Sequence, residues 1–321
     1  MQFGNPTPAR QPASLPNVRP LPRCEPPNAV LTTAGVVHNW PVAPTFVLVH
    51  GSGSNARTWS TAQQEMTLRG HRTIAVDLPG RGSGFSLAYH LQDLETFAAE
   101  PSALAGVTAA ETIGHVVDVV RQVREHGPVI LVGHSFGGLV ITGVGNAIPD
   151  LIDRIVYIAA QCPVDRAAGE YPTRPEWAAS DLLPATASII VGNPMKLGFI
   201  RLNWRGADPA SLAALRNAVS AELTEPEFLQ ALSASQPDEV LWQNDPEWDH
   251  RAEKDTWGRI PHTFIRLTND RAMPLAAQDL YISEADRLTP DNPFEVHSVK
   301  SSHAGFFRYP REIVDILTGT S

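Results

Sequence analysis

Short apolar runs alternate with segments of helical spacing over the first half of the chain. The runs that we predict as strands are Thr45–Val49, Arg72–Asp77, Val129–Gly133 and Arg154–Ala160. Their continuous apolar character is typical of strands that are buried on both faces of a sheet. The clearest predicted helix, Thr108–His126, ends at Gly127 and Pro128. This alternation predicts an α/β fold with a parallel sheet and right-handed crossovers.

The alternation stops between about residues 162 and 255. The chain there is polar, helical in spacing and interrupted by prolines. The strand pattern then resumes at Thr263–Leu267 and Phe294–Val299, with helices predicted over Pro274–Asp286 and Gly305–Leu317. Because strands flank the segment on both sides, we interpret residues 162–255 as an insertion into one domain. The core of that domain comprises residues 29–161 and 256–321.

The first 28 residues contain eight prolines and no hydrophobic period. Proline at this density blocks helical and sheet hydrogen bonds, so we predict an extended or disordered arm over residues 1–28. A PxxP docking site for a partner is the alternative interpretation. A short strand is also expected within Val30–Trp40.

The composition excludes several classes of function. Of 321 residues, 43% are hydrophobic and 18% are charged, which is typical of a globular protein with a large core. The net charge of −9, without any basic run, argues against nucleic acid or an anionic membrane as partner. Cys24 and Cys162 cannot form a disulfide framework. With no apolar segment of spanning length and no secretory pattern, we expect a cytoplasmic protein.

The strand Val129–Gly133 leads into the motif Gly133-His-Ser-Phe-Gly137, and a helical segment follows. A strand that turns directly into a helix strains its central residue, and larger side chains at the two glycine positions would collide. Such a turn exposes a serine hydroxyl above the sheet, at the positive end of the helix. We therefore predict that Ser135 is a nucleophile.

A serine nucleophile needs a base and a group that orients the base, and loops at the carboxyl ends of later strands supply them. The loop after Leu267 contains Asp270, and the loop after Val299 contains His303. The order Ser135, Asp270, His303 is typical of this architecture. The role of Asp270 remains open, because it could instead cap the following helix or form an Asx turn. In that case Asp165, which follows the preceding strand, is the alternative acid.

Acyl transfer also needs donors for the developing oxyanion. The Phe136 amide follows the nucleophile, and the glycine-rich loop after Val49 offers the Ser52 amide, with Gly53 as the alternate. The run Gly80–Gly84 lacks the spacing of a nucleotide-binding loop. The histidines show no metal-type spacing, so no metal and no cofactor are expected; His50 and His134 are expected to order loops.

Six blocks of the sequence resemble the α/β-hydrolase superfamily over about residues 42–318. They are Val47–Gly53, Val76–Gly82, Val132–Gly138, Ile155–Ala160, Thr268–Pro274 and Ser302–Gly305. Within it, the chain is most similar to the plant methylesterase and hydroxynitrile lyase branch and its bacterial relatives. The resemblance implies a mostly parallel central sheet flanked by helices, with a helical cap inserted after the sixth strand. It also implies a Ser135-Asp270-His303 triad, an oxyanion hole from the Ser52 and Phe136 amides, and a cap at the insertion.

One departure favours hydrolysis over the lyase reaction. The lyases of this branch have a threonine after the loop histidine and a lysine after the catalytic histidine, where this chain has Gly51 and Ala304. We therefore predict a serine hydrolase that cleaves a small-to-medium carboxylic ester or lactone through an acyl-enzyme. The sequence identifies no substrate-binding residue and leaves the oligomeric state open; tryptophans of the insertion either contact substrate or pin its helices.

Two kinds of alternative function remain. The same triad serves carbon–carbon bond hydrolysis, acyl transfer, perhydrolysis or lyase chemistry. The fold also serves as a ligand receptor with little turnover.

Overall fold

The computed structural model describes residues 42–82, 84–241 and 246–319. The predicted proline-rich arm and the strand predicted within residues 30–40 lie outside the described residues, so both stay predictions.

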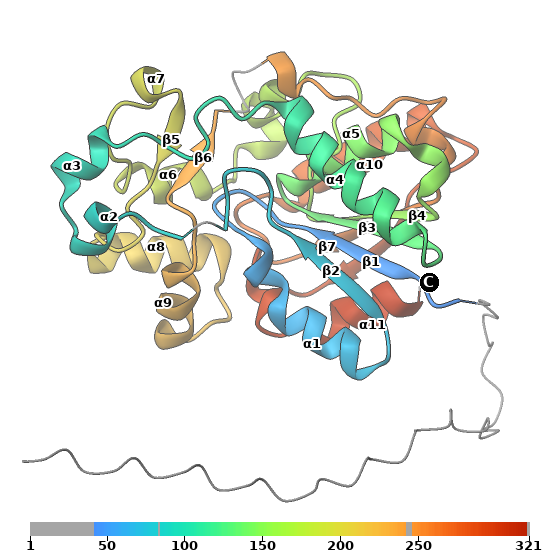
Figure 1. Ribbon diagram of the computed structural model, residues 1–321, viewed down its shortest axis with the longest axis horizontal. Coiled ribbons are helices and arrows are strands. Elements are labelled where there is room, and N and C mark those ends of the chain that lie inside the picture. The colour runs from blue at the N-terminus through green and yellow to red at the C-terminus, as the bar shows by residue number, and fades with distance from the viewer. Residues whose placement is uncertain (1–41, 83, 242–245, 320–321) are drawn as a thin grey trace, which may run out of the picture. The chain divides into compact units, whose positions relative to one another are not determined.

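A parallel sheet of six strands forms the centre of the described structure (Figure 1), in the order β2-β1-β3-β4-β7-β8. The strands are β1 (Thr45–Val49), β2 (Arg72–Val76), β3 (Val129–His134), β4 (Arg154–Ile158), β7 (His262–Leu267) and β8 (Glu295–Val299). In the register, Val49 pairs with Gly133 and His134 pairs with Ile158. The loops after these strands therefore leave from the same edge of the sheet, as the alternation of strands and helices predicts.

The prediction that Arg72–Asp77 is buried on both faces is wrong. β2 lies at the edge of the sheet, and four of its five residues are only half buried. An edge strand has a neighbour on one side only, and its apolar composition does not reveal that position.

Helices cover both faces of the sheet (Figure 1). Successive side chains of a strand point to opposite faces, so each strand contributes to both layers. One layer contains α1 (Ser60–Leu68) and α11 (Arg311–Gly319), and its apolar cluster includes Phe46 and Leu48 of β1. The other contains α4 (Ala109–Arg124), α5 (Gly137–Ala147) and α10 (Leu275–Leu288), and its cluster includes Val47 and Val49. Phe46, Val47, Leu48 and Val49 are fully buried, because both layers exclude water from β1. The α/β fold with a parallel sheet that the sequence predicts is confirmed.

Local signals explain where the helices begin. The α4 helix starts at a capping box: the Thr108 hydroxyl accepts the Glu111 amide at 3.1 Å, and the Glu111 carboxylate accepts the Thr108 amide at 3.0 Å. The predicted last helix, Gly305–Leu317, is divided into a 3-10 turn and α11, because Pro310 lies between them. The 3-10 turns of the described chain are Ala56–Trp59, Pro149–Leu151, Ala168–Thr173, Pro175–Trp177, Pro246–Trp248, Trp257–Arg259 and Gly305–Phe307.

The insertion has its own apolar cluster, which includes Leu215 and Phe228. Its elements are α6 (Leu182–Ala187), α7 (Pro194–Leu197), β5 (Phe199–Arg201), α8 (Pro209–Val219), α9 (Glu225–Ser233) and β6 (Asp238–Val240). The prediction that the insertion is helical is wrong in part, because the strands β5 and β6 within it form an antiparallel pair. It follows β4, the fourth strand of the described sheet, rather than a sixth. The short helices α2 (Leu87–Leu91) and α3 (Leu94–Ala99) lie beside it (Figure 1).

No helix within the described residues is long and apolar enough to cross a bilayer. The cytoplasmic location stays a prediction.

Candidate active site

Ser135 occupies a strained turn between β3 and α5. Its φ of 54° lies in the left-handed region, which a residue with a side chain rarely adopts. The flanking glycines permit the turn: a Cβ on Gly137 would lie 2.8 Å from the carbonyl oxygens of Val49 and His50, and one on Gly133 would lie 2.7 Å from Ile141. The side chain of Ser135 is thus presented at the carboxyl edge of the sheet, above the amino end of α5.

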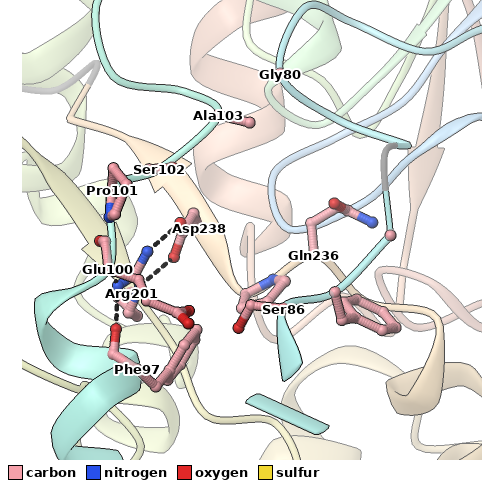
Figure 2. A pocket seen from close by; sticks show the side chains of 13 residues that line it. Gly80, Ser86, Phe97, Glu100, Pro101, Ser102, Ala103, Arg201, Gln236 and Asp238 are labelled. Carbon is pink, nitrogen blue, oxygen red and sulfur yellow. Dashed lines mark hydrogen bonds and ion pairs between the residues drawn. The ribbon is translucent and has the colours of Figure 1, made fainter. Parts of the chain in front are cut away.

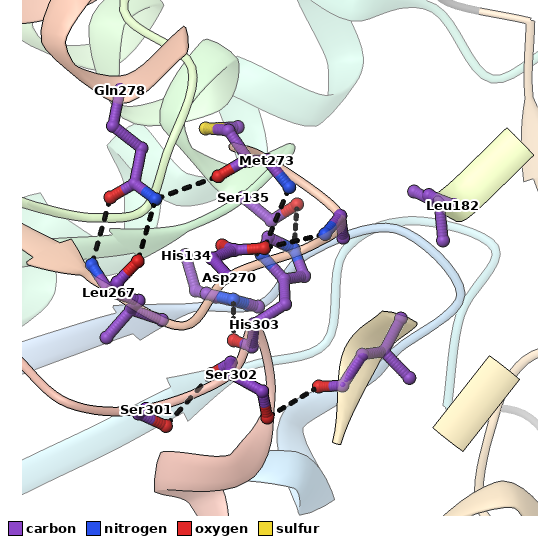
Figure 3. Close-up of polar contacts among 12 residues, drawn as sticks. His134, Ser135, Leu182, Leu267, Asp270, Met273, Gln278, Ser301, Ser302 and His303 are labelled. Atoms are coloured by element: carbon purple, nitrogen blue, oxygen red, sulfur yellow. Dashed lines mark hydrogen bonds and ion pairs between the residues drawn. The ribbon is translucent and has the colours of Figure 1, made fainter. Parts of the chain in front are cut away.

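Three of the residues predicted from the sequence meet at this edge (Figure 3). His303 Nε2 lies 2.9 Å from Ser135 Oγ, and His303 Nδ1 lies 2.6 Å from Asp270 Oδ2. Both His303 and Asp270 are 7% exposed, so this hydrogen-bonded chain is largely shielded from water. With Nδ1–H donating to the carboxylate, Nε2 is left as an acceptor for the serine proton.

The loop after β7 holds the Asp270 carboxylate in place. Its second oxygen, Oδ1, accepts the amides of Ala272 and Met273 at 2.8 Å each. Asp270 therefore forms the Asx turn that the sequence left open, and its other carboxylate oxygen contacts His303 at the same time. The other candidate acid, Asp165, is partly exposed and pairs with Arg287 at 2.9 Å, so the structure brings Asp270 and not Asp165 to the imidazole.

Gln278 is a further buried support of this loop that the sequence did not single out. From α10 its amide accepts the Leu267 N–H at 2.9 Å and donates to the carbonyls of Leu267 and Met273, at 3.1 and 2.8 Å (Figure 3). A glutamine on the apolar face of a predicted helix is the signal that could have identified it, because a buried amide needs partners.

Two other histidines order the loops around Ser135, as expected from the sequence. His50 Nδ1 donates to the Gly51 carbonyl at 2.9 Å, and Nε2 accepts the Leu78 amide at 3.3 Å. Burial, with a smaller contribution from nearby Arg81, lowers the pKa of His50 from 6.5 to about 3. His134 Nε2 lies 3.0 Å from the His303 carbonyl, and burial likewise lowers the pKa of His134 well below its usual value.

The loop after β1 approaches the nucleophile closely. A Cβ on Gly51 would lie 2.9 Å from the Ser135 Cβ, so only glycine lets the backbone come this near. Among the described residues, the Ser52 amide makes no hydrogen bond, whereas the Gly53 amide donates to Glu239 at 2.9 Å. Of the two candidate donors in this loop, Gly53 is thus already engaged.

Glu239 and its partner Arg81 are two more residues near the site that sequence reasoning missed. Their side chains form a buried ion pair between the loop after β2 and the strand β6. The two residues are 158 positions apart, and neither belongs to a local pattern that would reveal the contact.

The insertion hydrogen-bonds each of the three loops that surround Ser135. Ser180 and Asp181 donate to the carbonyls of Ala272 and Arg271 in the loop after β7. Val219 and Glu222 bind Ala304 and Ser302 in the loop after β8. Gln236 and Glu239 bind Gly53 in the loop after β1. The tryptophans that the structure describes in this segment also pack internally: Trp248 lies 5.0 Å from the Phe136 ring, and Trp204 donates to the Gln236 carbonyl at 2.8 Å. The packing interpretation of these tryptophans is therefore favoured.

A separate pocket of about 250 Å³ lies between Gly80, residues 84–86, Phe97, residues 100–103 and residues 236–238 (Figure 2). On its wall, Arg201 pairs with Asp238 at 2.7 Å and donates to the carbonyls of Phe97 and Glu100. The pocket includes none of Ser135, Asp270 and His303, so we do not assign it to the chemistry of the serine. Among the described residues, no cluster of side chains suits a metal ion.

Comparison with known proteins identifies the family of this chain. Residues 46–316 match the sequence profile of the alpha/beta hydrolase family. This chain belongs to the alpha/beta hydrolase family. The matched residues include Ser135, Asp270 and His303 and the whole insertion.

The sequence is similar to those of esterases from plants. The polyneuridine aldehyde esterase of Rauvolfia serpentina is 23% identical over 86% of this chain and 95% of its own. Methylesterase 17 of Arabidopsis thaliana is 26% identical over 85% of this chain and 90% of its own.

Solved structures within the alpha/beta hydrolase fold superpose well. That of polyneuridine aldehyde esterase has a TM-score of 0.65 at 20% identity and covers 87% of this chain and 99% of the other. A pyrethroid hydrolase from Sphingobium faniae JZ-2 has a TM-score of 0.63 at 19% identity, with coverages of 87% and 97%. At these identities the structural likeness establishes the fold.

Proposed function

We propose that this protein is a serine hydrolase that cleaves a small-to-medium carboxylic ester or lactone. Ser135 Oγ attacks the carbonyl carbon while His303 Nε2 takes the hydroxyl proton, and a tetrahedral oxyanion forms. His303 then gives the proton to the leaving alcohol, and the acyl group stays on Ser135. Water, activated by the same imidazole, attacks the acyl-enzyme and releases the acid.

The observation that carries this proposal is the pair of contacts on one imidazole. His303 lies within hydrogen-bonding distance of both Ser135 (2.9 Å) and Asp270 (2.6 Å). These distances fall within the range in which a base takes a proton from a nucleophile and a carboxylate stabilises the resulting imidazolium. The positive φ of Ser135 supports the same role, since strain of this kind is typical of a serine exposed for attack.

The Ser52 and Phe136 amides are the proposed oxyanion donors. The Ser52 amide has no partner among the described residues, and its loop lies against Ser135. The Phe136 amide directly follows the nucleophile at the amino end of α5, where the helix dipole favours negative charge.

Hydrolysis is a better proposal than the lyase reaction. The lyases that this chain resembles have a threonine at the position of Gly51, and here even a Cβ at that position would lie 2.9 Å from the Ser135 Cβ. A threonine hydroxyl is therefore excluded unless the loop moves.

The substrate class of the proposal comes from the relatives. Those reported above are named as esterases or hydrolases, which supports an ester as substrate. We also propose that residues 162–255 act as a cap over the site, because this segment hydrogen-bonds all three surrounding loops.

Burst kinetics with p-nitrophenyl esters of graded chain length test this function. We expect an initial release of p-nitrophenol equal to the enzyme concentration, with an acyl group found on the peptide that contains Ser135. Ser283→Ala is the matched control, because this serine is exposed on α10; the variant should retain the burst. If the wild-type protein releases no p-nitrophenol, or if the acyl group lies on another residue, the proposal is wrong. Tight ligand binding without turnover would favour a receptor.

A further inference from the structure

A buried ion pair joins the insertion to the loops around Ser135. Arg81 is 5% exposed and Glu239 is 6% exposed, and the guanidinium contacts the carboxylate directly. A buried ion pair is weak evidence for stability, because the cost of removing both charges from water offsets most of their attraction. Another explanation for its presence is therefore needed, and its other contacts supply one.

The Glu239 carboxylate binds three groups. Its Oε2 accepts the Gly53 amide at 2.9 Å, while Oε1 accepts from Arg81 and from the Val240 amide, the latter at 2.8 Å. Gly53 has a φ of 62°, and glycine can adopt many other backbone conformations, so this hydrogen bond selects one of them. The neighbouring peptide is fixed too, because His50 holds the Gly51 carbonyl at 2.9 Å.

These contacts determine the direction of the Ser52 amide. In a trans peptide the C=O and N–H groups point in opposite directions. With the Gly51 carbonyl held by His50, the Ser52 N–H points away from that imidazole. Because Glu239 holds the Gly53 N–H, the peptide between Ser52 and Gly53 cannot rotate and change the orientation of Ser52.

Arg81 extends the same arrangement to the second donor. Its guanidinium lies 5.5 Å from the centre of the Phe136 ring, within the range of a cation–π contact. The pair thus contacts the loop of one proposed donor through Gly53 and the residue of the other through its ring.

We propose that Arg81 and Glu239 are positioning residues that hold the Ser52 and Phe136 amides in the geometry needed to bind the oxyanion. This inference rests on the proposed serine-hydrolase function. In this role Glu239 acts through the Gly53 amide and Arg81 acts through the Phe136 ring, so neither is a catalytic residue.

The test compares four variants with the wild-type protein. Glu239→Ala removes the acceptor of the Gly53 amide, and Glu239→Gln keeps an acceptor oxygen without the charge. Arg81→Met with Glu239→Leu replaces the pair by apolar side chains of similar size, which is often neutral for stability. The matched control is Asp238→Asn. Asp238 lies next to Glu239 in β6, and among the described residues its side chain pairs with Arg201 rather than with the loop of Gly53.

Four quantities are measured: kcat and KM for a p-nitrophenyl ester, the inhibition constant of a trifluoromethyl ketone, and the melting temperature. The ketone carbon accepts Ser135 Oγ, the serine proton moves to His303, and the resulting hemiketal oxyanion occupies the site of the transition-state oxygen. Loss of a whole oxyanion donor costs about 10²–10³ in rate, so a displaced donor should cost about 10–100-fold.

We expect Glu239→Ala and the double variant to lose about 10–100-fold in kcat and to bind the ketone more weakly by a similar factor, with KM little changed. Glu239→Gln should retain more activity than Glu239→Ala, and Asp238→Asn should keep the wild-type kcat even if it melts earlier.

A folded double variant with wild-type kcat and ketone affinity would overturn the inference. So would a Glu239→Gln variant that folds and is no better than alanine, because the acceptor for Gly53 would then have no role. A fluorophosphonate probe separates this failure from that of the proposed function: if wild-type protein neither reacts with the probe at Ser135 nor hydrolyses esters, the function itself is wrong, and the inference with it.

Discussion

At the scale of single residues, the proposed chemistry depends on one imidazole held from two sides. Ser135→Ala and His303→Ala should each lower kcat for p-nitrophenyl acetate on the order of 10⁴-fold or more, and Asp270→Asn by about 10⁴-fold through loss of the correct tautomer. Asp165→Asn is the matched control, because that carboxylate pairs with Arg287 away from the site. Wild-type rates for either Ser135→Ala or His303→Ala would refute the assignment of the triad. If Asp270→Asn keeps the wild-type rate while Asp165→Asn is inactive, only the assignment of the acid is wrong.

The buried His50 gives a prediction for the pH dependence of stability. Its pKa is lowered to about 3 in the folded protein, mainly by burial, whereas the unfolded chain takes up the proton near the ordinary value of 6.5. Between these values the unfolded state binds more protons, so the free energy of unfolding falls as the pH falls from about 6.5 toward 3, by up to about 1.4 kcal/mol per pH unit.

The variant His50→Gln keeps a donor and an acceptor but does not titrate. Urea unfolding at pH 7, 6, 5 and 4 should show a smaller loss of stability in this variant than in wild type. His115→Gln, at an exposed position of α4, serves as the control and should follow the wild-type curve. Identical slopes for His50→Gln and wild type would contradict the buried neutral imidazole.

Local sequence predicts a residue of this site when its role follows from a turn or from the end of a strand. Ser135, Asp270 and His303 could all be located in this way, because strand ends meet at one edge of a parallel sheet. Glu239 could not, since its contact with Gly53 spans 186 positions and depends on how the insertion folds back. The choice between Asp270 and Asp165 also needed the structure, as both residues follow strands.

At the scale of elements, the close packing of α5 against the strands depends on its first glycines. A Cβ on Gly138 would lie 2.2 Å from the Gln161 carbonyl oxygen, which is backbone and cannot rotate away. Gly138→Ala should therefore shift α5, lower the melting temperature by several degrees and reduce kcat, because the helix carries the Phe136 amide at its start.

The matched control for this change is Gly114→Ala in the middle of α4. A Cβ there meets nothing within 4 Å, so alanine should stabilise the protein by about 0.5–1 kcal/mol through its better helix propensity, with kcat unchanged. Differential scanning calorimetry and steady-state rates distinguish the two sites. Equal melting temperatures for both variants would contradict the packing argument.

The elements themselves were predicted well where apolar periodicity is strong. The bounds of β1 and the start of α4 at Thr108 agree with the pattern, because a buried strand and a capping box both have local signatures, whereas α4 ends at Arg124, two residues before the predicted end. The strands β5 and β6 were missed, since each has three residues and their antiparallel pairing is decided by the tertiary fold. The position of β2 at the edge of the described sheet was also missed, because the order of the strands is decided by the tertiary fold.

At the scale of the whole molecule, one apolar cluster lies in the insertion, which hydrogen-bonds the loops around Ser135, and another lies between the sheet and the helices α1 and α11. Leu215 of α8 is 1% exposed within the cluster of the insertion, and α8 ends at Val219, whose carbonyl accepts the Ala304 amide at 2.6 Å beside His303. Ile313 of α11 is fully buried in the cluster beneath the sheet, on the side that carries α1. Both positions lose a similar volume when changed to alanine, but only one supports the loops around Ser135.

We therefore expect Leu215→Ala and Ile313→Ala to cost about 2–5 kcal/mol of stability each, with different effects on turnover. Measured at a temperature where denaturation curves show both variants to be folded, Leu215→Ala should lower kcat, because a loosened insertion no longer fixes the loops that carry Gly53, Asp270 and His303. Ile313→Ala should keep kcat near the wild-type value, since its cavity lies under the sheet. Equal rates in the two folded variants would mean that the insertion covers the site without positioning it, and the contacts from Ser180, Glu222 and Glu239 would then serve stability alone.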